Sequence, residues 1–201
     1  MHLVSNASVM GKSNRLQPHK HLVFVAFGFS LWLIVTPISA DGLSQGKRAY
    51  DDGRYELALQ LLKPLAAQGQ AEAQTIIGQM YHFGTGVAED DSKAFDLFLA
   101  AAQQGNADAQ YQLAGLYIYG FVNNAPTLDL DQEAARWYIA AAVQNHAAAQ
   151  YSLGLLLIAG TGVIQDSKEG ITWIRRSAEL GHPPARDFLG EMPTDDQDAN
   201  N

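Results

Sequence analysis

A short segment decides the fold of this chain, because the segment recurs almost unchanged. It reads AEAQTIIGQMYHFGTGV at 71–87 and AAAQYSLGLLLIAGTGV at 147–163. A third version, ADAQYQLAGLYIYG, lies between them at 107–120. The three copies begin 36 and 40 residues apart. Repetition at a period of roughly 20–50 residues is typical of repeat arrays, in which neighbouring units bury each other's apolar faces.

Each unit predicts a pair of helices. The first helix carries a glutamine, an aliphatic residue and a small residue on one helical stripe, which indicates a buried face. The small residue, at Gly78, Ala114 and Gly154, allows a neighbouring helix to approach closely. We expect Gly84 and Gly160 to end the first helix in the left-handed conformation.

The second helix of each unit is bounded by capping residues. Its N-caps are predicted at Asp90, Asp131 and Asp166. Its ends are predicted at Gly105, Asn145 and Gly181. The two tryptophans of the second helices, Trp137 and Trp173, are predicted to be core residues.

The Gly-Thr-Gly-Val loops at 84–87 and 160–163 do not predict a nucleotide site. A phosphate-binding loop follows a strand and carries a lysine, and both are missing from this pattern. We therefore interpret these glycines as structural and expect the valine to pack into the core.

The repeated pattern, A-x-A-Q…L-G…Y…G-T-G-V…D…K-A…W…A-A…G, resembles the Sel1-like repeat family, relatives of the tetratricopeptide repeat. Three copies occupy 71–106, 107–146 and 147–182, and 43–70 resembles a degenerate first copy. Residues 183–190 resemble the start of a further unit that caps the array. The resemblance implies an all-α fold over 41–190, a right-handed α-solenoid of about four helical hairpins with a C-terminal capping half-repeat. It also implies an adaptor that binds a protein through a concave groove.

The first 40 residues have the layout of a secretory signal. Residues 1–21 contain Lys12, Arg15 and Lys20 and no acid, and an uncharged run, LVFVAFGFSLWLIV, occupies 22–35. A basic end, an apolar stretch and a small residue at Ala40 predict export and cleavage before Asp41, with a periplasmic or secreted destination. The alternative is an uncleaved anchor in the membrane at 22–40. Translation starts at Met1 or at Met10.

Charge limits the classes of partner. The whole chain has a net charge of −8, and removal of 1–40 leaves 10 basic and 21 acidic residues, a net charge of −11. An acidic surface repels nucleic acid and anionic lipid head groups, so neither is an expected partner. The polar, acidic residues 191–201 predict a flexible tail.

The sequence predicts no catalytic, cofactor-binding or metal-binding residues. The chain has no cysteine, and neither a hydrolase nucleophile motif nor a zinc-protease motif occurs in it. His146 and His182 lie one repeat apart, too far to share a metal ion, and no acid beside them in sequence completes a ligand set. We therefore expect a protein that is not an enzyme.

Aromatic residues of the first helices are the candidates for partner binding. Tyr81, Tyr111 and Tyr119 either line the groove or pack between the repeats, and the sequence does not separate these two interpretations. The insertion that begins at Phe121 includes Leu128. Insertions in repeat arrays often form the binding face, although these apolar residues could equally fold back on their own repeat.

Three function classes follow. The first is an exported scaffold that binds a protein, whose identity the sequence does not give. The second is a binder of an envelope glycan, peptidoglycan or exopolysaccharide, through the same tyrosines. The third is a weak envelope hydrolase.

Overall fold

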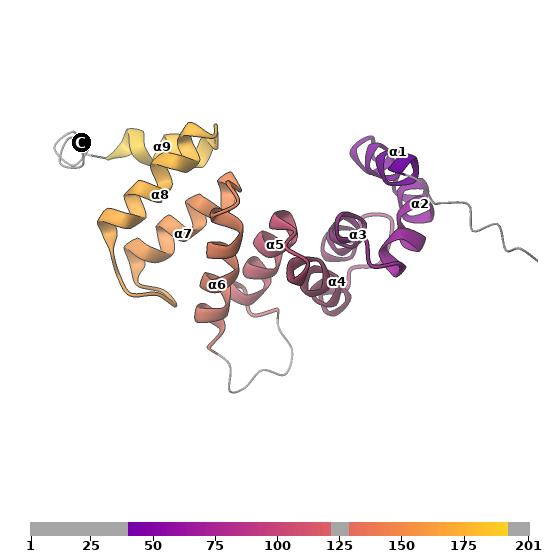
Figure 1. Cartoon of the computed structure of the whole chain (residues 1–201), viewed down its shortest axis with the longest axis horizontal. Helices are drawn as coiled ribbons and strands as arrows, with labels where there is room; N and C mark the ends of the chain where they lie inside the picture. The colour runs from indigo at the N-terminus through magenta and orange to yellow at the C-terminus, as the bar shows by residue number, and fades with distance from the viewer. Residues whose placement is uncertain (1–39, 122–128, 193–201) are drawn as a thin grey trace, which may run out of the picture. The chain divides into compact units, whose positions relative to one another are not determined.

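The computed structural model describes residues 40–121 and 129–192, which lie in one compact unit of the chain, residues 36–201. The described residues form nine α-helices and no strand (Figure 1). The helices are α1 (Ala40–Asp51), α2 (Tyr55–Ala67), α3 (Ala71–Phe83), α4 (Asp91–Gln103), α5 (Ala107–Ile118), α6 (Leu130–Ala142), α7 (Ala147–Ala159), α8 (Ser167–Glu179) and α9 (Pro183–Glu191).

The helices pack in chain order. Four hairpins form, α1 with α2, α3 with α4, α5 with α6 and α7 with α8. Each hairpin packs on the next through α2 with α3, α4 with α5 and α6 with α7, and α9 packs on α8 (Figure 1). Contact restricted mainly to sequence neighbours is the defining property of a solenoid. The predicted all-α solenoid is therefore confirmed.

Alanines let the helices of this unit approach one another closely. Many core positions are alanines with no exposed surface, and a few large side chains, among them Phe98, Leu62 and Leu113, fill the remaining space. The expected close approach at the small residues is also present. A Cβ atom on Gly78 would lie 2.6 Å from a ring carbon of Phe98, and one on Gly154 would lie 2.5 Å from Ile174.

A buried glutamine joins each repeat to the one before it. The side-chain amide of Gln74 donates to the carbonyl of Ala66 at 3.3 Å. Gln110 donates to Ala102 at 3.2 Å, and Gln150 donates to Ala142 at 3.1 Å. Each bond runs from a first helix to the second helix of the preceding hairpin, so it fixes how successive hairpins stack. We call this set the glutamine ladder (Gln74, Gln110 and Gln150).

A second glutamine completes the first two rungs of the ladder. Gln104 donates to the Oε1 of Gln74 at 2.9 Å, and Gln144 donates to the Oε1 of Gln110 at 2.8 Å. The equivalent residue of the last repeat is Leu180. The Oε1 of the buried Gln150 consequently has no hydrogen-bond partner in the part of the chain that the structure describes.

The cap retains the repeat spacing of this ladder. Arg186 occupies the place of the glutamine in α9 and donates from its Nε to the carbonyl of Ala178 at 3.2 Å. The separation of eight residues is the one found in all three glutamine rungs.

We predict that Leu180→Gln stabilises the protein. The backbone angles of Leu180 (φ −75°, ψ 0°) match those of Gln104 (φ −82°, ψ −1°), so a glutamine amide can reach Gln150 as Gln104 reaches Gln74. Satisfying a buried acceptor should raise the free energy of unfolding by about 1 kcal/mol. The melting temperature should rise by about 2–4 °C, measured by calorimetry. The matched control, Gln104→Leu, should lower it, and an unchanged or lower value for Leu180→Gln would contradict the ladder.

The glycines of the Gly-Thr-Gly loops have two separate functions. Gly84 and Gly160 end α3 and α7 in the left-handed region, with φ of +63° and +74°, as expected. The second glycine packs against the preceding repeat. A Cβ atom on Gly86 would lie 2.5 Å from that of Tyr55, and one on Gly162 would overlap the backbone carbonyl of Asp131. The loop valines, Val87 and Val163, pack against the core as expected.

One predicted cap is wrong. The N-cap of α6 is Asp129, whose carboxylate accepts from the backbone N–H of Gln132, and Asp131 lies in the first turn of the helix. Asp129 and Asp131 lie two residues apart where the insertion joins α6, so spacing alone does not identify the capping residue. Asp90 and Asp166 cap α4 and α8 as predicted. Gly105, Asn145 and Gly181 take positive φ after the second helices, as expected.

We predict that Gly162→Ala costs more stability than Gly105→Ala. Both glycines have positive φ, so each alanine pays backbone strain of about 1–2 kcal/mol. A Cβ atom on Gly105 meets no atom within 4 Å, whereas Gly162 lies against Asp131, which adds an overlap of about 1–3 kcal/mol. Chemical denaturation of the two variants measures the difference. Equal losses would show that this loop does not hold adjacent repeats together.

Part of the sequence interpretation lies outside the described residues. This holds for the predicted signal or anchor except Ala40, for most of the predicted tail, and for Leu128. Within the described residues, the structure contains no helix that is both long and apolar enough to cross a membrane.

Candidate functional site

Aromatic side chains gather where α3 and α5 end. Phe83 is 58% exposed, Tyr119 is 74% exposed and Phe121 is 41% exposed. The ring centroids of Tyr119 and Phe121 are 6.3 Å apart, and those of His82 and Phe83 are 4.6 Å apart. We call His82, Phe83, Tyr111, Tyr119 and Phe121 the aromatic patch.

His82 connects the two halves of the aromatic patch. Its ring lies 6.0 Å from the ring of Phe121, which comes from the following repeat. Its Nδ1 lies 2.6 Å from a carboxylate oxygen of Asp91 at the start of α4. Both side chains of this pair are partly buried, so the pair holds the imidazole in place beside the exposed rings. The contact of His82 with Phe121 was not predicted from the sequence, because it joins two different repeats.

A pocket of about 250 Å³ opens beside these rings. The first helices of three successive repeats line it, with Phe83 from α3, Tyr111 from α5 and Ser152 from α7, together with Tyr119 at the C-cap of α5. Tyr138 of α6 forms part of its wall, and burial raises the pKa of this tyrosine to about 12. Burial also raises the pKa of Tyr111. Both hydroxyls therefore stay neutral at physiological pH and can donate hydrogen bonds.

Tyr111 is fixed by the next repeat. Its ring stacks on the imidazole of His146, with centroids 4.8 Å apart and an interplanar angle of 24°. The Nδ1 of His146 accepts from the N–H of Ala149, and its Nε2 lies 3.1 Å from Asp108. Hydrogen bonding from His146 lowers the pKa of Asp108. A tyrosine–histidine contact recurs one repeat later between Tyr151 and His182, at 5.4 Å.

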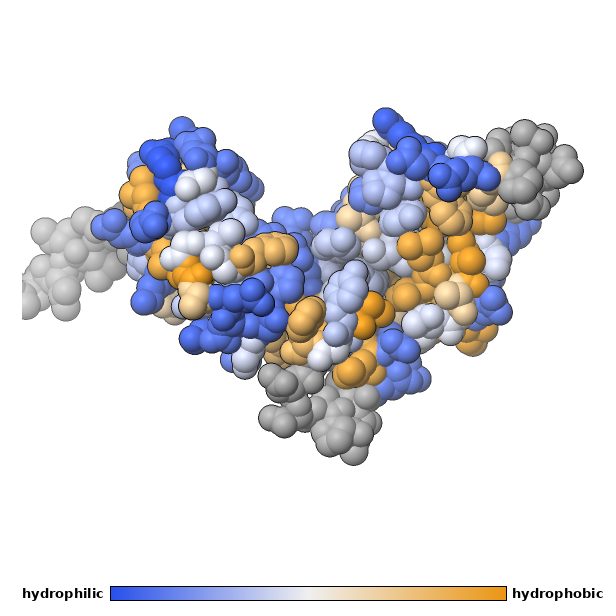
Figure 2. Space-filling model, turned by 180° about the vertical axis from the view of Figure 1, so that it is seen from behind, coloured by the Kyte–Doolittle hydropathy of each residue, from blue (hydrophilic) through white to orange (hydrophobic). Residues whose placement is uncertain are grey.

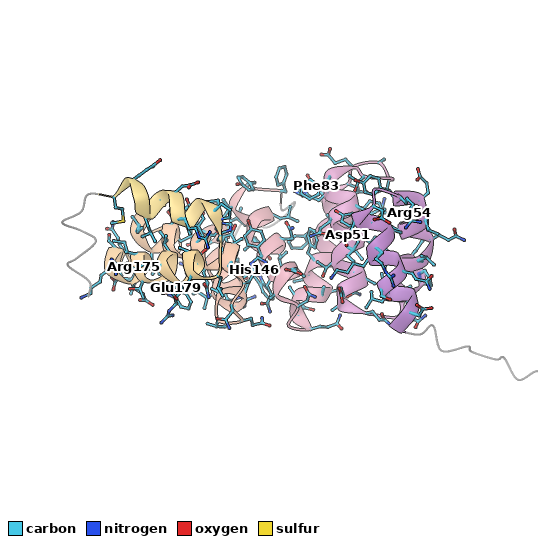
Figure 3. The ribbon with its side chains drawn as sticks, turned by 90° about the horizontal axis from the view of Figure 1, so that it is seen from above. Asp51, Arg54, Phe83, His146, Arg175 and Glu179 are labelled. Carbon is cyan, nitrogen blue, oxygen red and sulfur yellow. The ribbon has the colours of Figure 1, made fainter. Side chains whose placement is uncertain are left out.

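The candidate residues from the sequence separate into three groups. Tyr119 and Phe121 are exposed, and Tyr111 is half-buried in the pocket wall. Tyr81 packs against the first two core clusters beneath Lys93 and is not part of the aromatic patch. Leu128 lies outside the described residues. Figure 3 shows Phe83 and His146 well apart, in agreement with their places at opposite ends of the first helices.

The two tryptophans of the second helices differ. Trp137 packs between the second and third core clusters, as the sequence predicted. Trp173 contacts the third cluster but also lines a surface groove of about 430 Å³. Trp173 is therefore in part a core residue, as predicted, and in part a residue of the surface groove.

The aromatic patch offers apolar rings, hydroxyl donors and one anchored imidazole, a set suited to binding. Among the described residues, no group of three or more His, Asp or Glu side chains could hold a metal ion.

Comparison with known proteins gives consistent results. A protein of Rhizobium meliloti (strain 1021), described as "Exopolysaccharide production negative regulator", is 30% identical over 73% of this chain and 59% of its own length. This chain spans about three fifths of the length of the curated Rhizobium relatives that it matches.

Two solved structures are similar to this fold. The first is a Sel1 repeat protein from Oxalobacter formigenes, with a TM-score of 0.66 and 36% identity over 73% of this chain and 57% of that chain. The second is a protective antigen of uropathogenic Escherichia coli strains that displays an SLR fold. It has a TM-score of 0.66 and 29% identity over 75% of this chain and 32% of that chain.

The model of the family described as "Sel1 repeat" matches residues 71–106, 107–146 and 147–182. These residues together make up more than half of the chain. These segments are the hairpins α3–α4, α5–α6 and α7–α8, joined by the glutamine ladder. The chain therefore belongs to the Sel1 repeat family.

Proposed function

We propose that this chain is an exported scaffold that holds another protein against its aromatic patch. Sel1 repeat proteins generally mediate protein–protein interaction, and the repeats cover most of the described residues. The observation that carries the proposal is the exposure of three neighbouring aromatic rings, Phe83, Tyr119 and Phe121, at the ends of two adjacent first helices.

Exposed rings of this kind are costly unless a partner covers them. Phe83 and Tyr119 occupy the same position in successive repeats, and the last repeat has Ala159 there. The aromatic residues are therefore not a requirement of the repeat fold. Contiguous apolar surface on a folded chain marks an interaction site. Phenylalanine and tyrosine bury large areas with little loss of rotamer entropy, which is why interfaces use aromatic anchors.

The rigidity of the patch supports the same function. His82 is held by Asp91, and Tyr111 is stacked on His146, so two of the five patch residues need little ordering when a partner binds. A preorganised surface binds more tightly because less conformational entropy is lost on association.

Binding of an envelope glycan is the second candidate. Tyrosine rings can stack on sugar rings, and the Rhizobium relatives are described as negative regulators of exopolysaccharide production. An action on exopolysaccharide through a bound protein would be compatible with the same description, so the two candidates differ in what touches the patch. The general use of Sel1 repeats for protein–protein interaction favours a protein as what touches the patch.

We predict that Phe83→Ser together with Tyr119→Ser abolishes partner binding without unfolding the chain. Both side chains are more than half exposed, so their loss removes little core. Loss of two aromatic anchors should lower the amount of captured partner roughly thirtyfold or more. The measurement is crosslinking in cells, followed by capture of the full-length protein through a C-terminal tag and quantitative mass spectrometry.

The matched control is Leu57→Ser, which removes an exposed apolar side chain on α2, away from the patch. A partner recovered equally with the double variant and the control would overturn the aromatic patch as the binding surface. Recovery of glycan fragments in place of a protein would favour the second candidate.

Export has a separate test in the same captured material. We predict that the N-terminal residue of the mature protein is Asp41, because the basic, apolar and small-residue layout of 1–40 is typical of a signal that is cleaved after Ala40. Mass spectrometry of the N-terminal peptide measures this. An N-terminus at Met1 or Met10 together with membrane fractionation would establish the anchor, and the same N-terminus in the cytoplasmic fraction would overturn export.

A further inference from the structure

A groove lies on the last repeat, away from the aromatic patch. It has a volume of about 430 Å³ and lies between α6, α7 and α8 and the loop that joins the last two. Its apolar lining is Ile139, Leu153, Leu157, Val163, Ile164 and Trp173. We call it the C-terminal groove, and it shares no residue with the aromatic patch. On the face that Figure 2 shows, hydrophobic residues gather over the C-terminal half of the described chain.

Two isoleucines of the groove are exposed to an unusual degree. Ile164 is 91% exposed at the loop, and Ile139 is 42% exposed on α6. Val143, one helical turn after Ile139, is 62% exposed. A β-branched apolar side chain with nine tenths of its surface in water contributes nothing to the packing of its own repeat.

Comparison of the repeats shows that Ile164 and Val143 are not required by the fold. The equivalent of Ile164 in the repeat 71–106 is Ala88, and the equivalent of Val143 is Gln103. The repeat 71–106 thus forms the same loop and the same helix with a small residue and a polar residue at these two positions. Large apolar side chains at these two positions occur only in the two repeats that form the groove.

The rim of the C-terminal groove is acidic. Asp166 and Glu169 line it, and an adjoining depression that shares Val163 and Ile164 is lined by Asp129. Neither lining contains a lysine, an arginine or a histidine. Within the described residues, no ion pair involves any of these three carboxylates.

The same comparison of repeats applies to charge. The position of Glu169 is occupied in the repeat 71–106 by Lys93, which pairs with the capping Asp90 at 2.7 Å. In the last repeat the same place at the start of the second helix therefore carries two acids, Asp166 and Glu169, in place of an acid paired with a lysine. Glu169 accepts a hydrogen bond from the indole N–H of Trp173 at 3.3 Å, which holds its carboxylate at the rim. Arg176 lies over the indole ring, 4.6 Å from its centroid, and covers one of its faces.

We propose that the C-terminal groove binds a segment of another protein whose apolar side chains are flanked by lysine or arginine. The apolar floor takes one or two aliphatic or aromatic side chains, and the three carboxylates of the rim pair with the flanking cations. An amphipathic basic helix presents an apolar face whose edges are bordered by cations. The acidic residues at 191–201 of this chain do not fit, since they carry the charge of the rim.

A defined peptide tests this proposal. The probe is a fluorescein-labelled amphipathic peptide of about 14 residues, with leucines on one helical face and lysines on the other. We expect it to bind the purified protein at about 0.15 M salt, measured by fluorescence anisotropy. A control peptide with the same leucines and with glutamate in place of each lysine should not bind. A second control, with the residues of the lysine peptide in scrambled order, should bind much more weakly.

Variants of the groove then separate a specific site from general attraction to an acidic protein. Ile164→Ser should weaken binding roughly tenfold, because the exposed side chain is buried only in the complex. Asp166→Asn with Glu169→Gln should weaken it roughly threefold. The asparagine keeps the N-cap of α8 and the glutamine keeps an acceptor for Trp173. The matched control, Asp96→Asn with Glu56→Gln, has the same net charge and should bind as the unaltered protein does.

Several outcomes would overturn the proposal. Equal weakening by the groove variants and the charge-matched control would reduce the binding to general electrostatics. Equal affinity for the lysine and glutamate peptides would remove the basic partner. Dimerisation of the purified protein that Ile164→Ser abolishes, measured by sedimentation, would assign the groove to a second copy of this chain. None of these variants alters the aromatic patch, so failure here leaves the proposed function standing.

Discussion

The hydrogen bond from a buried glutamine to a carbonyl of the preceding hairpin is the contact on which the array depends. Gln74, Gln110 and Gln150 each make it, and Arg186 makes the equivalent bond in the cap. A buried amide without a partner costs more than the bond itself contributes, so the bond fixes the register between hairpins as well as joining them. Alanines on both sides of each rung bring the helices close enough for the bond to form.

Fixed stacking explains how function can reside at the ends of the helices. Because successive first helices lie at a constant offset, side chains from separate repeats meet in a reproducible way. The contact of His82 with Phe121 and the stacking of Tyr111 on His146 both arise across a repeat boundary. The positions where one repeat differs from its neighbours, Phe121 in the insertion and Ile164 in the last loop, are then free to serve binding.

Much of the fold was predictable from the sequence, since it follows from local signals. The helix pairs, the left-handed glycines and the close approach at Gly78 and Gly154 depend on residues within one repeat or on its period. The cap of α6 was predicted wrongly at Asp131, because the insertion breaks the period just where the helix begins at Asp129.

The candidate site was less predictable, because exposure depends on contacts between repeats. Tyr81 and Tyr119 both lie near the end of a first helix, yet Tyr81 is packed between two core clusters and Tyr119 is 74% exposed. The pairing of His146 with Asp108 joins residues 38 positions apart. A position-by-position comparison of the repeats would have singled out Ile164 against Ala88 and Glu169 against Lys93, but not their exposure.

The central claim is that departures from the repeat pattern mark the surfaces that hold partners. The most direct measurement places a photoreactive phenylalanine analogue in turn at each large hydrophobic residue that is exposed, and maps the crosslinked products in cells by mass spectrometry. The account predicts protein adducts at Phe83, Tyr119, Phe121, Ile139, Val143 and Ile164, and none above background at Leu57 and Leu180. Adducts spread evenly over all eight positions, or found only at Leu57 and Leu180, would contradict it.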